Sequence, residues 1–246
     1  MNKGVLYSIQ PQHCDNILKL LKEWEIRKVK PSIEPPFTGY IYCTKEKSIN
    51  NVFLIYGGGK YACFGDYRNA YTCDADGKVD CYIGNGKIIG EFVCDKIVEL
   101  ESEFWDDETY ESIGVVRYDE DREEKEKSIF ATNGEENWLC RKACLKWEEL
   151  RKYIGQDINT FYALHISQLK IYEAPKELRE FYKPIKYDNV CGANVVHCGH
   201  YQGLETVDYC EYNDGDCSLK GCKELRNLYQ IKRPPQSWCY VEVDND

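Results

Sequence analysis

The sequence predicts an α+β domain, a small β-barrel with a few flanking helices and a cysteine-rich insertion near the C-terminus. Three observations predict this class. Strand-length apolar runs recur along all 246 residues, helical periodicity is confined to two short segments, and strands and helices do not alternate regularly. Regular alternation is what a Rossmann or TIM architecture requires, so neither is expected. Hydrophobic residues make up 43% and aromatic residues 13%, which is enough for a sizeable core.

Strands are expected where apolar residues alternate or cluster between turn-forming residues. The expected strands are residues 4–9, 24–29, 39–44, 51–56, 87–100, 161–172 and 237–243. One helix is expected to begin at Pro11, a residue favoured in the first turn, and another to cover residues 145–154 and end at Gly155. Turn signals at Asp76-Gly77 and Asn85-Gly86 predict irregular β-hairpins between residues 57 and 87.

Residues 101–137 are acidic and show little periodicity, so we expect a surface excursion there. The first ten residues contain no apolar run that resembles a signal peptide, and no stretch approaches the ~20 apolar residues of a membrane span. We therefore expect a soluble, cytoplasmic protein without a membrane partner, in which most of the 14 cysteines are thiols.

The net charge of −10 argues against a protein that coats long nucleic acids, because lysine and arginine neutralise phosphates in such complexes. The charge is unevenly distributed, however. Acidic residues concentrate between residues 99 and 126, whereas cations crowd the N-terminal segment at Lys19, Lys22, Arg27, Lys28 and Lys30. A local basic site for a short ligand is compatible with this distribution.

Three charged residues of that segment are candidates for a binding site. Lys22, Glu25 and Arg27 are spaced so that a strand from Trp24 onward puts Glu25 and Arg27 on one face, with Trp24 and Ile26 on the other. A carboxylate between two cations stays ionised. Two interpretations follow: a ligand-binding site in which the cations hold a phosphate or a base, or a solvated, charge-paired strand face.

His165 is one of only four histidines and lies in an expected strand. It is a candidate pocket residue, because a near-neutral pKa suits base recognition or proton transfer. A buried histidine that serves only the core is the alternative.

A cysteine cluster late in the chain predicts a structural zinc. Seven potential ligands lie among polar residues that cannot form a core: Cys191, His197, Cys198, His200, Cys210, Cys217 and Cys222. Four soft ligands on zinc order such a segment, and we assign them to Cys191, Cys198, Cys210 and Cys217. Free thiols or occasional disulfides are the alternative, since no Cys-x-x-Cys pair occurs here.

The run Lys22-Glu23-Trp24-Glu25-Ile26-Arg27-Lys28 resembles the signature of the ASCH family, a branch of the PUA-like superfamily. That signature is Gly-x-Lys-x-x-Glu-x-Arg after an N-terminal strand and helix, and Leu20 stands at its glycine. Further segments similar to bacterial and phage members are residues 35–43, 90–92, 165–172 and 233–241. Matches from Val5 to Val241 imply one domain over residues 1–246, with insertions at about 57–87, 101–137 and 188–228.

The resemblance implies a PUA-like barrel whose cleft binds RNA, a nucleobase or a nucleotide, with Lys22, Glu25, Arg27 and His165 as ligand-binding residues. One ASCH subfamily hydrolyses N4-acetylcytidine with a lysine, a threonine and a glutamate, and this chain has Glu25 at the threonine position. The alternatives are a hydrolase of a modified nucleoside or RNA, with Lys22 and Glu25 as the acid–base pair and His165 assisting, and a protein-interaction adaptor that uses the insertions.

Overall fold

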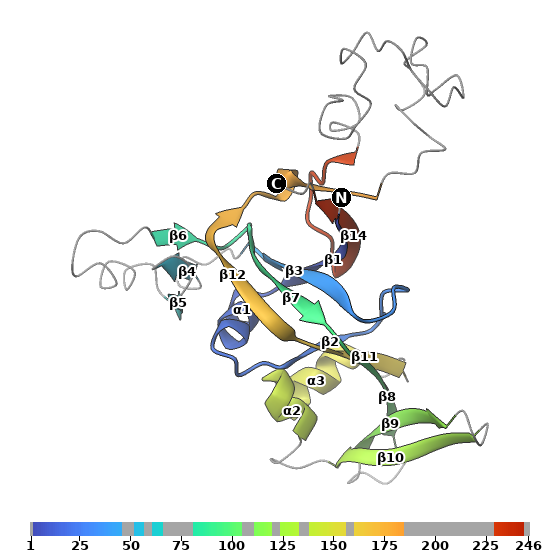
Figure 1. Ribbon diagram of the computed structural model, residues 1–246. Helices are drawn as coiled ribbons and strands as arrows, with labels where there is room; N and C mark the ends of the chain where they lie inside the picture. The colour runs from blue at the N-terminus through green and yellow to red at the C-terminus, as the bar shows by residue number, and fades with distance from the viewer. Residues whose placement is uncertain are drawn as a thin grey trace, which may run out of the picture.

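The computed structural model describes residues 2–45, 52–56, 61–65, 81–104, 111–119, 124–132, 138–155, 160–184 and 229–243. It has an α+β fold dominated by β-sheets, with few helices (Figure 1). Sheet A has the strand order β12-β7-β3-β1-β14-β13, sheet B the order β10-β9-β8-β11-β2, and sheet C the order β5-β4-β6.

Sheet A places the two ends of the described chain side by side. Its strands are β1 (Asn2–Ile9), β3 (Phe37–Cys43), β7 (Ile88–Cys94), β12 (Ser167–Lys176), β13 (Phe181–Tyr182) and β14 (Trp238–Val243). β1 pairs in parallel with β3 on one side and antiparallel with β14 on the other. The interior position of β1 fits its near-continuous apolar sequence, because both faces of the strand are covered.

Sheet B consists of β2 (Trp24–Arg27), β8 (Ile97–Phe104), β9 (Glu111–Asp119), β10 (Glu124–Thr132) and β11 (Thr160–His165). Within the acidic segment 101–137, where the sequence predicts an excursion, β9 and β10 form an antiparallel hairpin at the end of sheet B. Charged residues such as Arg117 and Glu126, which are register partners, conceal the alternation that would identify these strands.

Two segments expected as single strands, residues 87–100 and 161–172, each divide between the two sheets. β7 ends at Cys94 and β8 begins at Ile97, whereas β11 ends at His165 and β12 begins at Ser167. β7 pairs with β12 in sheet A, and β8 pairs with β11 in sheet B. The two chain segments therefore bend together and link the sheets, a feature that periodicity does not reveal because the apolar pattern continues through the bend.

The helices lie close to the expected positions, with one addition. α1 (Pro11–Leu18) begins at the predicted proline, and α3 (Trp147–Ile154) ends at Gly155, whose φ of +81° suits glycine. α2 (Trp138–Ala143) is not predicted, since six residues are too few for clear periodicity. In sheet C, β4 (Val52–Tyr56) pairs antiparallel with β5 (Tyr61–Gly65) and with β6 (Cys81–Ile83). The predicted turn at Asn85-Gly86 closes no hairpin, because it leads from β6 in sheet C to β7 in sheet A, and the turn predicted at Asp76-Gly77 lies outside the described residues.

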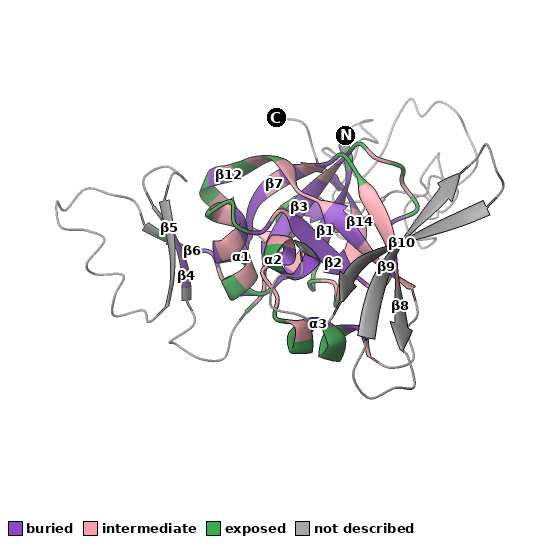
Figure 2. Cartoon of the chain, turned by 90° about the horizontal axis from the view of Figure 1, so that it is seen from below, coloured by how far each residue is buried: buried purple, intermediate pink, exposed green. Residues whose placement is uncertain are grey.

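Three apolar clusters form the core. Val5, Tyr7 and Ile9 project from one face of β1 into a cluster with α1, and Leu6 projects from the other face into a cluster with β3, β13 and β14. A third cluster lies between sheet B and the pair α2 and α3. Figure 2 shows the buried strands at the centre of the molecule.

The described strands do not close into a barrel, so the barrel part of the expectation is not confirmed. The cysteine-rich segment 188–228 lies outside the described residues, as do most of residues 57–87. In the part of the chain that the structure describes, no helix has the length and apolar content needed to span a bilayer.

Candidate functional site

The candidate site begins with the short strand β2, which brings Glu25 and Arg27 into the interior. Trp24 and Ile26 project into the core cluster of sheet B, α2 and α3, as the strand period predicts. Glu25 and Arg27 project the other way, where the guanidinium carbon of Arg27 lies 5.5 Å from the centre of the Tyr7 ring. The chain reaches β2 through a turn after α1, in which the Lys22 amide donates to the Asn16 carbonyl at 3.1 Å.

Lys22, Glu25 and Arg27 form a buried ion triad. The Arg27 Nη2 atom lies 2.9 Å from Glu25 Oε1, and Lys22 Nζ lies 3.3 Å from Glu25 Oε2. Only 3% of Lys22, 8% of Glu25 and 5% of Arg27 is exposed. The structure therefore brings together the three residues that the sequence nominates. Their side chains are charge-paired, but they are buried and do not form the solvated strand face that was the alternative to a binding site.

Backbone carbonyls fix the two cations of the triad. Lys22 Nζ donates to the Ala143 carbonyl at the end of α2, at 2.7 Å. Arg27 Nη2 donates to the Ser8 carbonyl at 2.8 Å, and Arg27 Nη1 donates to the carbonyl and hydroxyl oxygens of Ser237 at 3.2 and 3.1 Å. Arg27 thus holds the end of β1 against the chain that enters β14.

The electrostatics of the triad keep Glu25 ionised. Burial by itself raises the pKa of Glu25, but Lys22 and Arg27 outweigh burial and hold that pKa below its ordinary value. The pKa of the nearby His13 imidazole is lowered, first by burial and then by Lys22. A carboxylate with a lowered pKa is a weak base and carries no proton near neutral pH, so this geometry favours recognition by Glu25 over acid–base catalysis.

Several buried polar atoms around the triad have no hydrogen-bond partner among the described residues. They are the Tyr7 hydroxyl, His13 Nδ1 and Arg27 Nε, whereas Glu25 Oε2 has only the Lys22 ammonium, at 3.3 Å, beside it. Electrostatic interactions connect these groups. The charges of Arg27 and Glu25 both act on the pKa of the Tyr7 hydroxyl, and the charge of Glu25 acts on the pKa of His13. Since an unpaired buried polar atom is costly, atoms of this kind gathered in one place are candidates for contact with an ordered water or a polar ligand. We call the triad with Tyr7 and His13 the recognition centre.

Lysine and tyrosine side chains alternate beside the recognition centre. Lys28 Nζ lies 5.4 Å from the centre of the Tyr153 ring, and Lys30 Nζ lies 5.5 Å from the centre of the Tyr162 ring. Tyr162 is the register partner of Arg27, and the Tyr153 hydroxyl interacts electrostatically with Arg27 and Glu25. These four residues, Lys28, Lys30, Tyr153 and Tyr162, are called the Lys–Tyr strip below. Of these four residues, the sequence indicated only the two lysines as part of a basic site, because the tyrosines lie far from them along the chain.

The structure does not bring His165 to the triad. His165 is the register partner of Trp24, so its ring projects from the same face of β2 and β11 as Trp24, opposite to the face of Glu25. The ring centroids of His165 and Trp24 lie 4.9 Å apart. Its Nδ1 atom lies 2.6 Å from Asp95 Oδ1 at the bend between β7 and β8. Because the strand period separates adjacent residues onto opposite faces, Leu164, not His165, lies on the Glu25 face.

The predicted zinc ligands Cys191, Cys198, Cys210 and Cys217 lie outside the described residues, so the zinc site stays a prediction. The described part of the chain contains no group of three or more histidine, cysteine or carboxylate side chains placed to hold a metal. The expected thiol character of Cys43 and Cys94 agrees with their burial as free cysteines in the core.

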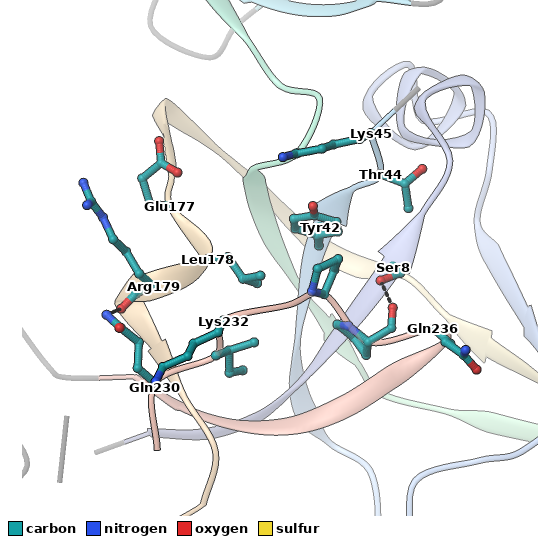
Figure 3. A pocket seen from close by; sticks show the side chains of 14 residues that line it. Ser8, Tyr42, Thr44, Lys45, Glu177, Leu178, Arg179, Gln230, Lys232 and Gln236 are labelled. Carbon is teal, nitrogen blue, oxygen red and sulfur yellow. Dashed lines mark hydrogen bonds between the residues drawn. The ribbon is translucent and has the colours of Figure 1, made fainter. Parts of the chain in front are cut away.

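A pocket lies on the other side of β1, where the sequence predicts no site. This pocket has a volume of about 800 Å³ and is formed by the ends of β1 and β3, the 3₁₀ turn Leu178–Glu180 and residues 230–236 (Figure 3). Ser8 separates it from the recognition centre: the Ser8 side chain lines the pocket, whereas the Ser8 carbonyl accepts from Arg27. No local pattern could have located this pocket, because it is assembled from distant segments.

Comparison with known proteins adds little to this geometry. No family model matches the chain, and no curated protein matches it. Two solved structures are similar along its length. One is an ASCH protein from Zymomonas mobilis, with a TM-score of 0.37 and 12% identity over 97% of this chain and 87% of that chain. The other is a mutant of the Zymomonas mobilis protein, with a TM-score of 0.37 and 12% identity over 97% of this chain and 90% of that chain. Values this low do not assign the chain to a family, so the proposals below rest on its own residues.

Proposed function

We propose that this protein binds a nucleotide or a short single-stranded RNA, with the recognition centre contacting a base and the Lys–Tyr strip contacting the adjoining nucleotides. The observation that carries the proposal is the group of unpartnered polar atoms around the buried triad. The Glu25 oxygen accepts hydrogen bonds, whereas the Tyr7 hydroxyl and Arg27 Nε can donate them. Acceptors and donors arranged together match the mixed edge of a nucleobase.

The Lys–Tyr strip favours a nucleic acid over other polar ligands. Tyrosine rings offer stacking surfaces for bases, and the lysines beside them offer phosphate contacts. The strip is short and the chain carries a net charge of −10, so the proposed ligand covers a few nucleotides and not a long duplex.

A titration with labelled single-stranded RNA of about ten nucleotides, a length within the usual range for such sites, tests the proposal. Replacing both strip lysines, Lys28→Ala with Lys30→Ala, leaves the triad intact and is expected to weaken binding by at least about tenfold. The control is Lys3→Ala, which removes an exposed lysine of β1 outside the strip. Binding that is equal in all three proteins, or absent in the unmodified protein, rejects the proposal.

The hydrolase alternative gains no specific support from these distances, since Glu25 is held ionised and His165 lies on the other face. Turnover of N4-acylated cytidine or RNA in the same samples, lost in a Glu25→Gln protein that circular dichroism shows to be folded, would establish it. The adaptor alternative rests on insertions of which the structure describes only parts. The predicted structural zinc on Cys191, Cys198, Cys210 and Cys217 remains part of the proposal as the element that orders the third insertion.

A further inference from the structure

We propose that the pocket beyond Ser8 is a second ligand site, which binds the phosphate of an organic anion of nucleotide size. This site is separate from the recognition centre, because the two lie on opposite faces of β1. Tyr7 of the recognition centre belongs to the core cluster with α1, whereas Tyr42 of the pocket belongs to the cluster on the other face of sheet A.

Three cations from separate chain segments line the pocket. Lys45 follows β3, Arg179 lies in the 3₁₀ turn and Lys232 lies in the segment before β14 (Figure 3). All three residues are exposed. Cations that are distant in sequence and share one hollow create a local positive field in a protein whose net charge is −10. A phosphate group, with up to two negative charges and several acceptor oxygens, is the ligand that such a field suits best.

The single carboxylate of the lining does not cancel this charge. Glu177 Oε1 lies 2.9 Å from Lys87 Nζ, which is not a lining residue. The hydrogen bond from Lys87 lowers the pKa of Glu177, although burial opposes it, and Lys87, Arg179 and Lys45 lower it further through their charges. Glu177 therefore remains an anion already paired with Lys87, and the three lining cations are left in excess.

The remaining lining indicates that the phosphate belongs to an organic molecule. The apolar part consists of Tyr42, Leu178, Ile231, Pro234 and Pro235. A volume of about 800 Å³ falls within the usual range of small-molecule sites and far exceeds a single phosphate. Apolar walls exclude water from a ring or an aliphatic body while the exposed cations hold the anionic end.

Hydrogen bonds hold the walls in place without a ligand. The Ser8 hydroxyl donates to the Pro235 carbonyl at 2.6 Å, and Gln230 Nε2 donates to the Arg179 carbonyl at 2.6 Å. The Gly86 amide donates to the Cys43 carbonyl at 2.7 Å, which fixes the turn opposite. A preformed pocket loses little conformational entropy when a ligand binds, so moderate charge contacts suffice for binding.

Calorimetric titration of the full-length protein at low salt with inorganic phosphate, AMP and ATP tests the proposal. AMP and ATP are expected to bind, and more tightly than inorganic phosphate. Arg179→Ala and Lys232→Ala are each expected to weaken that binding by about tenfold, the usual effect of one charged hydrogen bond. The control Lys3→Ala removes another exposed lysine, outside the pocket, and is expected to change nothing.

The phosphate could belong to a free nucleotide or to the 5′ end of an RNA, and the probes separate these sources. If the source is RNA, a 5′-phosphorylated oligonucleotide binds more tightly than its 5′-hydroxyl form, and Arg179→Ala with Lys232→Ala abolishes the difference. If the source is a free nucleotide, AMP and ATP bind and the two oligonucleotides bind equally. The proposal is overturned if no probe binds, or if the variants bind every probe as the unmodified protein does. Both variant residues are exposed, so a folding defect is not expected.

Discussion

The Arg27 guanidinium lies 2.9 Å from the Glu25 carboxylate in the interior of the protein, where each residue is at most 8% exposed. Desolvation of two charges is unfavourable, and their mutual attraction offsets it only when the geometry is good and the remaining polar atoms are hydrogen-bonded. Arg27 meets this condition through Ser8 and Ser237, whereas Glu25 Oε2 is paired with the Lys22 ammonium at 3.3 Å, a longer contact than a good hydrogen bond. Because a carboxylate oxygen has more than one lone pair, Glu25 Oε2 can accept a further hydrogen bond from a ligand.

The first prediction compares two neighbouring glutamates of different burial. Glu25→Gln leaves two buried cations without a counter-charge and is expected to lower the free energy of unfolding by about 3–5 kcal/mol. Glu23 also pairs with a lysine, Lys142, but both side chains are more than one-third exposed. Glu23→Gln is therefore expected to cost less than about 1 kcal/mol. Urea unfolding of both variants measures the difference, and equal costs contradict the buried triad.

The second prediction concerns stability at acid pH. The folded-state pKa of Glu25 lies below its ordinary value of 4.5, so its contribution to stability is complete above that value and is lost as the pH falls through the folded pKa. The folded-state pKa of His13 is also lowered, so His13 takes up a proton more readily in the unfolded chain than in the folded protein. Stability is therefore expected to fall as the pH drops below 6.5, the ordinary pKa of histidine.

Urea unfolding at a series of pH values separates the two residues. His13→Gln is expected to flatten the decline that begins near pH 6.5, and Glu25→Gln is expected to flatten the decline below pH 4.5. A variant whose profile runs parallel to that of the unmodified protein throughout would show that its residue does not titrate in the way described.

These sites were only partly predictable from the sequence. The spacing of Lys22, Glu25 and Arg27 predicts a shared strand face, and the structure confirms that Glu25 and Arg27 lie together, because strand geometry is local. Their burial was not predictable, since it depends on β1 and on α2 and α3, which lie far along the chain. For the same reason the pocket beyond Ser8 has no sequence signal.

The bends at the sheet junction show the same limit of local patterns. Residues 87–100 are apolar enough for one continuous strand, and only the partners of β7 and β8 reveal that the segment turns between Cys94 and Ile97. His165 lies beside this bend, and its side-chain direction follows from register with Trp24. The apolar pattern of residues 161–172 correctly placed His165 in a strand, but neither that pattern nor the resemblance carried information about the direction of its side chain.

The third prediction concerns the salt dependence of RNA binding. Each lysine that neutralises a phosphate of single-stranded RNA contributes about 0.7 to the slope of log affinity against log salt concentration. Replacing Lys28 and Lys30 by alanine is therefore expected to reduce that slope by about 1.4 in total. Titrations at several salt concentrations measure the slope. An unchanged slope would mean that the Lys–Tyr strip does not contact phosphate.

The fourth prediction concerns the metal. Elemental analysis of protein purified without chelators is expected to find about one zinc per chain, because four thiolates form a closed structural site. Cys191→Ser and Cys210→Ser are each expected to remove it. Cys239→Ser, a substitution in β14 outside the cluster, serves as the control and is expected to retain it. Zinc that is absent, or equally present in all variants, contradicts the assignment.

The nuclear magnetic resonance signal of the Arg27 Nε–H group tests the central claim most directly. This group is buried and has no hydrogen-bond partner among the described residues, and a base bound in the recognition centre would accept its proton. Arg27→Lys assigns the signal by its disappearance. A short single-stranded RNA is expected to shift the signal in proportion to occupancy. A signal that stays in place at saturating RNA, while other resonances move, would contradict recognition at this centre.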